Sequence, residues 1–189
     1  MTQAISKPIT LEEFLQQPET QPAQEYIEGN IYTKLMPQGQ HSTIQGELVT
    51  IINSVTKKSK IAWAFPELRC TFTDKSIVPD VAVFEWKNLP VNDDGTISNQ
   101  FLLPPDWIIE ILSPNQSQSL VTKKIVHCLT NGTQMGWLID PNQKLIFTYT
   151  INSHPLYFET ENEVIPVPDF TTDVKVTLGD IFGWLQVKA

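Results

Sequence analysis

The sequence lacks a long apolar run and is poor in cysteine. No stretch approaches the roughly 20 consecutive apolar residues that span a bilayer, and the first residues show no basic region followed by an apolar core, so we expect neither membrane insertion nor export. The two cysteines, Cys70 and Cys128, have no CxxC spacing, which is typical of small buried side chains in a reducing compartment. We therefore expect a cytoplasmic protein.

Basic residues are also scarce. The chain has 13 Lys and Arg against 21 Asp and Glu, a formal net charge of −8 at pH 7. Non-specific nucleic-acid binding depends on clustered Lys and Arg that neutralise phosphates, and the longest basic cluster here is Lys57-Lys58-Ser59-Lys60. The composition predicts weak sequence-independent affinity for DNA, although metal ions at an acidic site offset part of the repulsion.

The length of the chain and the order of its expected elements predict the fold class. With 189 residues and 41% hydrophobic content, the chain is long enough for one well-cored domain and short for two. The elements occur in an order typical of a mixed sheet flanked by helices, an α+β fold. We expect one domain over residues 1–189, with a core at about 25–141 and a C-terminal hairpin and short helix at 142–189.

Capping signals, turn residues and apolar spacing locate the individual elements. The expected helices cover residues 10–15, 41–55, 117–129 and 178–185. The expected strands cover a hairpin at 25–35 and segments at 61–65, 68–72, 79–84, 107–114, 137–140, 145–151 and 156–159. The stretch 88–105, rich in Asn, Asp and Pro, is expected to form a loop.

One carboxylate stands in the middle of a strand that should be buried on both faces. The segment around Glu110, Trp107-Ile108-Ile109-Glu110-Ile111-Leu112, is almost wholly apolar and rich in β-branched residues, as central strands are. An ionised carboxylate in an apolar interior is costly unless a cation or hydrogen-bond donors meet it. We expect Glu110 to face a metal ion, a lysine or an arginine; the alternative is a purely structural ion pair.

Asp80 gives Glu110 a second carboxylate as a neighbour. It opens another apolar strand, directly after Pro79. Two carboxylates on neighbouring central strands raise each other's pKa unless a cation sits between them. Hard divalent ions such as Mg²⁺ bind carboxylate oxygens and keep several waters, which suits such a pair. Alone, Asp80 would be interpreted as a turn residue; together with Glu110 it indicates a metal site.

The helix after Glu110 supplies a lysine. At 100° per residue Leu120, Val121, Ile125, Cys128 and Leu129 form one apolar arc. Lys124 falls on the shoulder of this arc, whereas Lys123 points away from it. A buried ammonium beside two carboxylates can steady developing charge or position a water; the alternative is a lysine that covers the flank of the helix.

These residues fall in motifs that resemble the Uma-two family, DUF820-type proteins akin to restriction endonucleases within the PD-(D/E)XK nuclease superfamily. The motifs are Glu25-Tyr26-Ile27-Glu28-Gly29, His41, Pro79-Asp80, Glu110-Ile111-Leu112-Ser113-Pro114, Lys124, Gly132 and Trp137-Leu138-Ile139-Asp140-Pro141. The resemblance covers roughly residues 10–185 and agrees in order and spacing. It implies a restriction-endonuclease-like mixed β-sheet core flanked by helices, with extra β-hairpins.

The resemblance also implies the roles of the site residues. Asp80 and Glu110 would bind the metal, and Lys124 would replace the lysine that the superfamily usually places two residues after the second acidic residue, where this chain has Leu112. Glu25 would be the additional acidic residue of the site. The implied cofactor is Mg²⁺, for which Mn²⁺ can substitute.

Three more residues are candidates for the same site. Glu47 competes with Glu25, because it lies near apolar positions of the first long helix and is not clearly solvent-facing. Glu67 follows Pro66 between two strands and could point into the same cleft. His41 matches the histidine that opens the family's first long helix, and is either a helix-start residue or part of the cleft lining.

Two functions remain open on these grounds. The first is a Mg²⁺-dependent endonuclease that hydrolyses DNA phosphodiester bonds, and the homodimer expected for it would suit a cut on both strands. The second is a catalytically silent nuclease fold used as a binding or assembly module, which the acidic net charge favours. A metallohydrolase acting on another substrate is a third interpretation.

Overall fold

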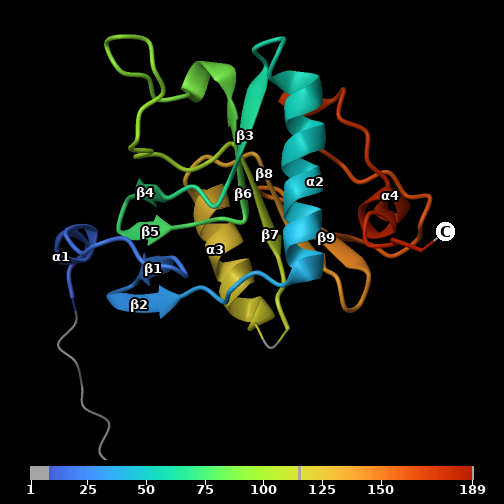
Figure 1. Ribbon diagram of the computed structural model, residues 1–189, viewed down its shortest axis with the longest axis horizontal. Coiled ribbons are helices and arrows are strands. Elements are labelled where there is room, and N and C mark those ends of the chain that lie inside the picture. Colours follow the sequence, from blue (N-terminus) through green and yellow to red (C-terminus); the bar gives the residue numbers. More distant parts are fainter. Residues whose placement is uncertain (1–8, 115, 189) are drawn as a thin grey trace, which may run out of the picture.

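A computed structural model describes residues 9–114 and 116–188 (Figure 1). Within them, the α-helices are α1 (Leu11–Leu15), α2 (Gly39–Thr56), α3 (Gln118–Thr130) and α4 (Leu178–Gly183), and two short 3-10 helices cover Trp86–Asn88 and Asp169–Thr171. The strands are β1 (Gln24–Ile27), β2 (Asn30–Thr33), β3 (Ala62–Pro66), β4 (Cys70–Phe72), β5 (Lys75–Ile77), β6 (Val81–Glu85), β7 (Trp107–Ile111), β8 (Met135–Asp140), β9 (Leu145–Tyr149) and β10 (Leu156–Phe158).

The larger sheet is mixed and has the order β10-β9-β8-β7-β6-β3. Strands β7 and β8 are parallel, and their crossover connection is α3. The other neighbouring pairs are antiparallel. Strand β7 therefore lies inside the sheet, and all five of its residues are buried. This agrees with the apolar composition of the segment, because a strand covered on both faces has no solvent side to keep polar.

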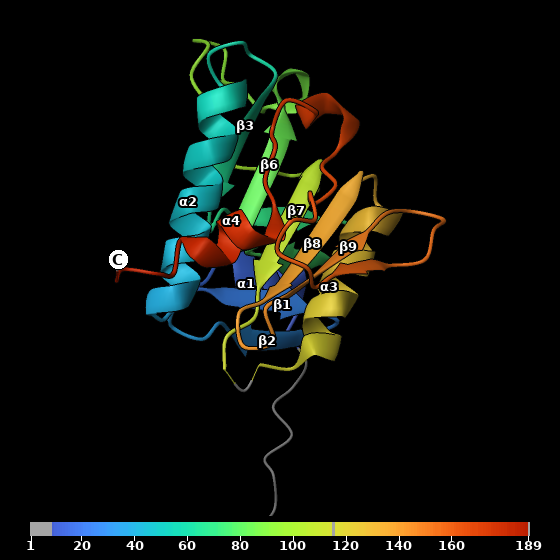
Figure 2. The ribbon, with the colours of Figure 1, turned by 90° about the vertical axis from the view of Figure 1, so that its right-hand side faces the viewer.

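Helices cover the two faces of this sheet, and residue parity decides which face a side chain meets. Side chains such as Val81, Ile109 and Trp137 pack with residues of α2 and α4. The alternate set, which includes Ala82 and Ile108, packs with residues of α3, β4 and β5. Figure 2 shows α2 and α3 on opposite sides of the strand layer. Glu110 has the parity of Ile108 and so belongs to the α3 face.

A second, smaller sheet has the order β2-β1-β5-β4. The β1–β2 hairpin turns at Glu28-Gly29, where both residues have positive φ values of 52° and 79°; glycine adopts such a value without the steric cost of a Cβ. Strand β1 pairs with β5 through Tyr26 and Ser76. This small sheet lies beside α3 (Figure 1) and brings the N-terminal hairpin to the face that carries Glu110.

Most elements lie where the sequence predicts them, and the α+β class with a mixed sheet is confirmed. Helix α1 begins with the predicted capping box, because Thr10 and Glu13 each accept the other's backbone N–H. Two features were not predicted: β5 is an additional strand, and β4 and β5 form a second, smaller sheet with the β1–β2 hairpin. In the described part of the chain no helix is both long and apolar enough to cross a membrane.

Candidate functional site

Asp80 lies directly before β6, where the ladder to β7 places it beside Glu110. Val81 of β6 pairs with Ile109 of β7. Because the two strands are antiparallel, the residue before Val81, Asp80, lies opposite the residue after Ile109, Glu110. The Ile111 N–H donates to Asp80 Oδ2 at 2.7 Å, which ties the carboxylate to the end of β7. The Asp80 side chain is almost completely buried. The strand pairing therefore brings the two sequence-predicted carboxylates together.

Two basic side chains from outside the large sheet, those of Lys34 and His41, contact the Asp80 carboxylate. Lys34, just after β2, donates from Nζ to Asp80 Oδ1 at 2.7 Å and to the Val78 carbonyl at 2.8 Å. His41, in the first turn of α2, places Nε2 3.2 Å from Asp80 Oδ2. Although burial by itself raises the pKa of Asp80, Lys34 and His41 together lower it well below its usual range. The Asp80 carboxylate is thus ionised and held in place by three donors, Lys34, His41 and the Ile111 N–H.

Glu110 pairs with Lys124, the inward-facing lysine of α3. Lys124 Nζ lies 2.9 Å from Glu25 Oε1 and 3.0 Å from Glu110 Oε1, and all three side chains are buried. Glu25 Oε1 also accepts the Val78 N–H at 2.8 Å. The contact of Glu110 Oε1 lacks hydrogen-bond geometry, so this buried oxygen has no hydrogen-bond partner in the described chain. An ammonium thus bridges carboxylates from both sheets.

Burial and charge act in opposite directions on this pair. Burial raises the pKa of Glu110 to about 8, because the effect of Lys124, which lowers it, is smaller and Asp80 adds a further rise. Burial alone would lower the pKa of Lys124, but Glu110, Glu25 and Asp80 together raise it above its usual value. Lys124 therefore keeps its charge at neutral pH, and Glu110 is the member of the pair that titrates.

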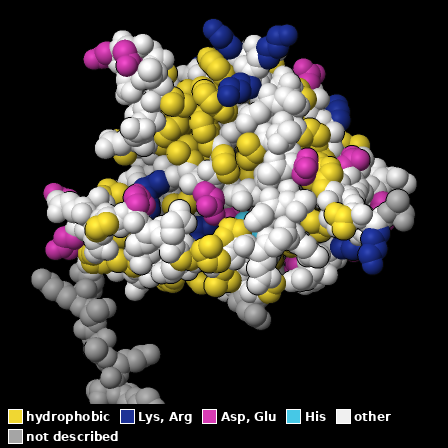
Figure 3. All heavy atoms as spheres, in the orientation of Figure 1, with side chains coloured by type: hydrophobic (Ala, Val, Ile, Leu, Met, Phe, Trp, Pro, Cys, Tyr) yellow, Lys and Arg dark blue, Asp and Glu magenta, His cyan; other side chains and the backbone are white. Residues whose placement is uncertain are grey.

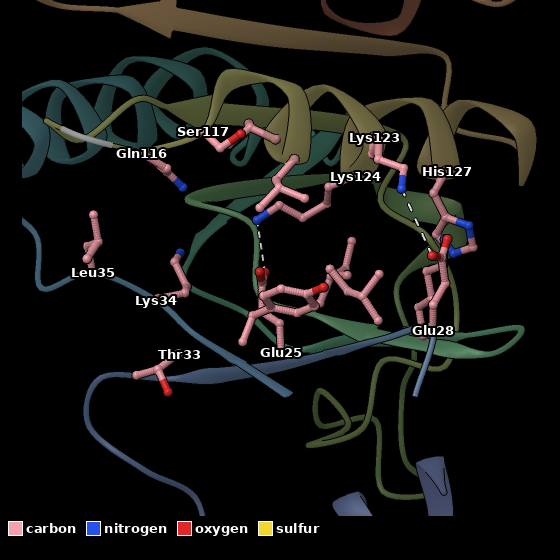
Figure 4. Close-up of a pocket in the computed structure, with 16 residues that line it drawn as sticks. Glu25, Glu28, Thr33, Lys34, Leu35, Gln116, Ser117, Lys123, Lys124 and His127 are labelled. Atoms are coloured by element: carbon pink, nitrogen blue, oxygen red, sulfur yellow. Dashed lines mark hydrogen bonds and ion pairs between the residues drawn. The ribbon is translucent and has the colours of Figure 1, made fainter. Parts of the chain in front are cut away.

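A pocket of about 350 Å³ opens beside this ion cluster, between the β1–β2 hairpin and α3 (Figure 4). Glu25, Lys34 and Lys124 belong both to the pocket lining and to the ion cluster. In Figure 4 Lys34 and Gln116 point toward one another across the space, with the Glu25–Lys124 pair beside them. Asp80 and Glu110 are not among the lining residues. The two carboxylates thus lie behind a layer that contains both lysines.

The donor set fits a hard divalent ion bound by few protein ligands. Mg²⁺ characteristically takes one or two carboxylates and completes its shell with waters or phosphate oxygens. Asp80 and Glu110 are adjacent, and Glu110 Oε1 accepts no hydrogen bond, although Lys124 Nζ lies 3.0 Å from it. No group of three or more His, Cys, Asp or Glu in the described residues is arranged to hold a metal. The arrangement fits a two-carboxylate site and not a protein-only cage.

Two candidates from the sequence lie outside the cluster. Glu47 is exposed, which corrects the expectation that it competes with Glu25. The buried face of α2 runs through Ile44, Gln45 and Leu48, and at 100° per residue Glu47 points away from the centre of that stripe. Glu67 has a side chain 37% exposed and reaches the cluster only through Lys34, at 3.8 Å. Its backbone N–H donates to the Asp80 carbonyl at 3.2 Å.

The sequence reasoning missed two residues, Lys34 and Gln45. Gln45 is buried on α2, where its Nε2 donates to the Asp80 carbonyl at 2.8 Å. A polar residue on the apolar stripe of a helix was the signal that could have identified it. Lys34 gave no such signal, because it lies in a short extended segment 46 positions from Asp80. Leu120, placed on the apolar arc of α3, is instead 48% exposed and lines the pocket.

The surrounding surface has no continuous basic band on the face seen in Figure 3. Lys and Arg side chains there are dispersed among acidic ones, apart from a small group near the end of α2, where Lys57, Lys58 and Lys60 follow. Lys57 is partly engaged by Trp63, with Nζ 3.9 Å from the ring centroid. The positive charge relevant to the site is therefore concentrated in the pocket lysines.

The fold is that of a nuclease-like protein, as comparison with known sequences and structures shows. The chain belongs to the Uma2 family, described as "Putative restriction endonuclease", whose profile matches residues 11–179. A solved structure from Anabaena variabilis ATCC 29413, described as a putative nuclease belonging to DUF820, is 55% identical. The alignment covers 95% of this chain and 100% of that one, with a TM-score of 0.93. No curated protein matches the sequence.

Proposed function

We propose that the protein is a Mg²⁺-dependent endonuclease of the PD-(D/E)XK type that hydrolyses DNA phosphodiester bonds. The observation that carries this proposal is the meeting of Asp80, Glu110 and Lys124 at one end of adjacent strands, beside an open pocket. A structural ion pair needs one carboxylate for one lysine. Here three buried carboxylates surround two lysines, and one buried carboxylate oxygen lacks a hydrogen bond. Membership of a family of nuclease-like proteins supports the same activity.

A divalent ion bound by Asp80 and Glu110 would activate a water and neutralise charge on the leaving oxygen. Mn²⁺ is expected to substitute for Mg²⁺. Lys124 contributes a fixed ammonium that stabilises the extra negative charge on the phosphoryl oxygens as water attacks. Glu25 positions that ammonium through its 2.9 Å contact. His41 and the Ile111 N–H fix the orientation of the Asp80 carboxylate. Lys34, the cation on Asp80, faces the pocket and can meet the adjacent phosphate.

Nicking of supercoiled plasmid DNA tests this proposal directly. The wild-type chain should nick with Mg²⁺ or Mn²⁺ and stop in EDTA, whereas Asp80→Asn and Glu110→Gln should lose activity together with metal binding. Lys124→Met should keep metal binding, measured by calorimetry, and lose at least 100-fold in rate. Glu47→Gln, an exposed carboxylate on α2, is the matched control and should cut normally. Full nicking by Lys124→Met would overturn the assignment of Lys124.

A catalytically silent binding or assembly module is the second candidate, and one contact favours it. Lys34 already neutralises Asp80 at 2.7 Å, and the two predicted metal ligands lie behind the pocket lining. In that case the ion cluster would serve only to join the two sheets. Thermal unfolding with Mg²⁺, Mn²⁺ and EDTA separates the two functions: an active site gains stability from the ion by mass action, whereas a closed ion cluster gives the same midpoint in all three.

A further inference from the structure

The lining of the pocket beside the ion cluster combines apolar side chains with two separate cationic groups. Ile27, Ile77 and Val121 supply aliphatic surface, and Tyr32 adds an aromatic ring. Near one end Lys34 and Lys124 belong to the ion cluster. At the other end Lys123 points toward Glu28, with His127 close by (Figure 4). Four of the chain's 13 basic residues line this one pocket, in a protein whose net charge is −8.

The cationic end away from the ion cluster carries surplus positive charge. Lys75 Nζ lies 3.4 Å from Glu28 Oε1, and Lys123 Nζ lies 4.0 Å from Glu28 Oε2. Two ammonium groups therefore share one carboxylate, whose side chain is 56% exposed. Because the Glu28 contacts are long and partly solvated, they hold the two lysines weakly. Neither lysine is held in a buried ion pair, so both ammonium groups can donate to a phosphate bound at this end of the pocket.

Exposed apolar side chains mark the pocket as a contact surface. Tyr32, Leu35 and Leu120 are 39%, 50% and 48% exposed, and all three line it. Large apolar groups that gather around one opening favour a ligand that covers them. Gln116 adds a polar group: its Oε1 accepts the Ser113 N–H, which leaves the amide Nε2 able to donate. A flat heterocycle with polar edges matches this combination.

The size of the pocket limits what it can hold. Small-molecule sites run from about 300 to 1,000 Å³, so about 350 Å³ accommodates one small ligand and excludes a duplex. We propose that the pocket binds a single unstacked deoxynucleotide, with its base against Tyr32 and Leu120, one phosphate at the ion cluster, and the next phosphate at Lys75 and Lys123. This inference rests on the proposed function, which gives DNA as the substrate, and adds that one nucleotide of the DNA is unstacked when bound.

Unstacking a nucleotide from a duplex costs free energy, and the cost is smaller at mismatches, in single strands and at strand ends. The pocket therefore predicts that single-stranded or locally opened DNA binds more tightly than a fully paired duplex. Base–aromatic stacking depends little on base identity, so Tyr32 should hold any of the four bases. The pocket should therefore discriminate between unpaired and fully paired DNA, and not between base sequences.

The test uses the full chain in EDTA, so that no cleavage is needed. Calorimetric titration should show binding of dTMP and dAMP, with thymidine and inorganic phosphate each at least tenfold weaker than dTMP. Leu120→Trp fills the opening from α3 and should weaken dTMP binding at least tenfold. Val126→Trp is the matched control, because Val126 is 45% exposed on the same helix, does not line the pocket, and should bind dTMP normally.

Oligonucleotides containing 2-aminopurine distinguish an extruded internal nucleotide from a strand end. A fluorescence change for the internal probe supports extrusion, and a change for the terminal probe alone assigns the pocket to strand ends; both keep the single-nucleotide occupant. Equal dTMP affinity for Leu120→Trp and the wild type, or no dTMP binding at all, would overturn the inference. Plasmid nicking with no dTMP binding leaves the proposed function standing, while dTMP binding without nicking rejects only catalysis.

Discussion

Two adjacent lysines on α3 illustrate how one residue step separates a site residue from a surface residue. The Lys123 side chain is 69% exposed, whereas that of Lys124 is 4% exposed and contacts two carboxylates. The helical wheel predicts this difference, because Lys124 lies on the shoulder of the apolar arc. The helix stays docked through Val121, Ile125 and neighbouring apolar residues. The apolar arc therefore positions the ammonium.

Substitution of these two lysines should affect stability very differently. Lys124→Met leaves Glu25 and Glu110 without their cation, and breaking a buried ion pair costs about 3–5 kcal/mol. We expect a loss of about 3 kcal/mol at pH 7.5, the lower end of this range, because Glu110 with its pKa of about 8 is already largely protonated there. Lys123→Met should change stability by less than about 0.5 kcal/mol. Urea unfolding of both variants measures the difference, and equal midpoints would contradict the geometry.

Glu110 should make the stability of the metal-free protein depend on pH. Burial raises its pKa in the folded state to about 8, above the ordinary value of about 4.3 for an unfolded chain. The folded state therefore binds the proton more tightly, and stability falls as pH rises from about 4.3 through 8. Glu110→Gln stays neutral and lacks this contribution. Urea unfolding in EDTA at pH 5.5, 7.0 and 8.5 should show that the stability of Glu110→Gln relative to the wild type increases with pH. A difference in unfolding free energy that stays constant with pH would contradict the raised pKa of Glu110.

At the scale of elements, the strong periodic signals were predictable. The apolar segment of β7 and the amphipathic pattern of α3 both gave the right element and the right face for Glu110 and Lys124. Strand β5 has only three residues and follows a turn in which Thr73 has φ 52°, so it offered no alternation long enough to recognise. Lys34 was missed because its partner is chosen by the docking of the hairpin. Short segments whose place is set by tertiary contacts leave no local pattern.

The packing of α3 on β8 gives a prediction at the same scale. A Cβ on Gly136 would overlap the Ile125 Cγ2 methyl of α3 and lie 3.3 Å from Ile108 Cγ2. Gly136→Ala should therefore cost about 1–3 kcal/mol through overpacking. Gly46, on the exposed side of α2, has nothing within 4 Å of an added Cβ, and Gly46→Ala should add up to about 1 kcal/mol. Thermal unfolding should show a lower midpoint for Gly136→Ala and a higher midpoint for Gly46→Ala. A higher midpoint for Gly136→Ala would show that α3 can shift to accommodate the methyl group.

At the scale of the whole molecule, charge sets how the protein meets its substrate. The net charge is −8, and the basic groups near the site are the pocket lysines. Electrostatic steering of DNA across a broad surface is therefore absent from this design. Under the proposed function, recognition of DNA would depend on contacts at the pocket and on a divalent ion that offsets the local negative charge. Composition alone predicted the weak surface attraction, but it gave no sign that four lysines gather in one place.

DNA binding without divalent ions should accordingly be weak. Non-specific binders typically reach dissociation constants of about 10⁻⁴–10⁻⁶ M at physiological salt. For this chain in EDTA and 150 mM salt we expect a value weaker than about 10⁻⁴ M for duplex DNA. Fluorescence anisotropy should show tighter binding when Mg²⁺ is added. Micromolar affinity in EDTA with a steep salt dependence would instead reveal a basic surface that the charge distribution does not predict.

The contact between Lys124 and Glu25 joins residues 99 positions apart. Closing so long a loop carries an entropic cost that only the finished fold repays. The β1–β2 hairpin is synthesised before α3, so Glu25 is present in the growing chain before its partner Lys124 has been added. Until α3 docks, no ammonium stands beside Glu110 and the pocket has only one wall. A chain synthesised only as far as β7 thus carries all three carboxylates of the site, Glu25, Asp80 and Glu110, but no assembled site.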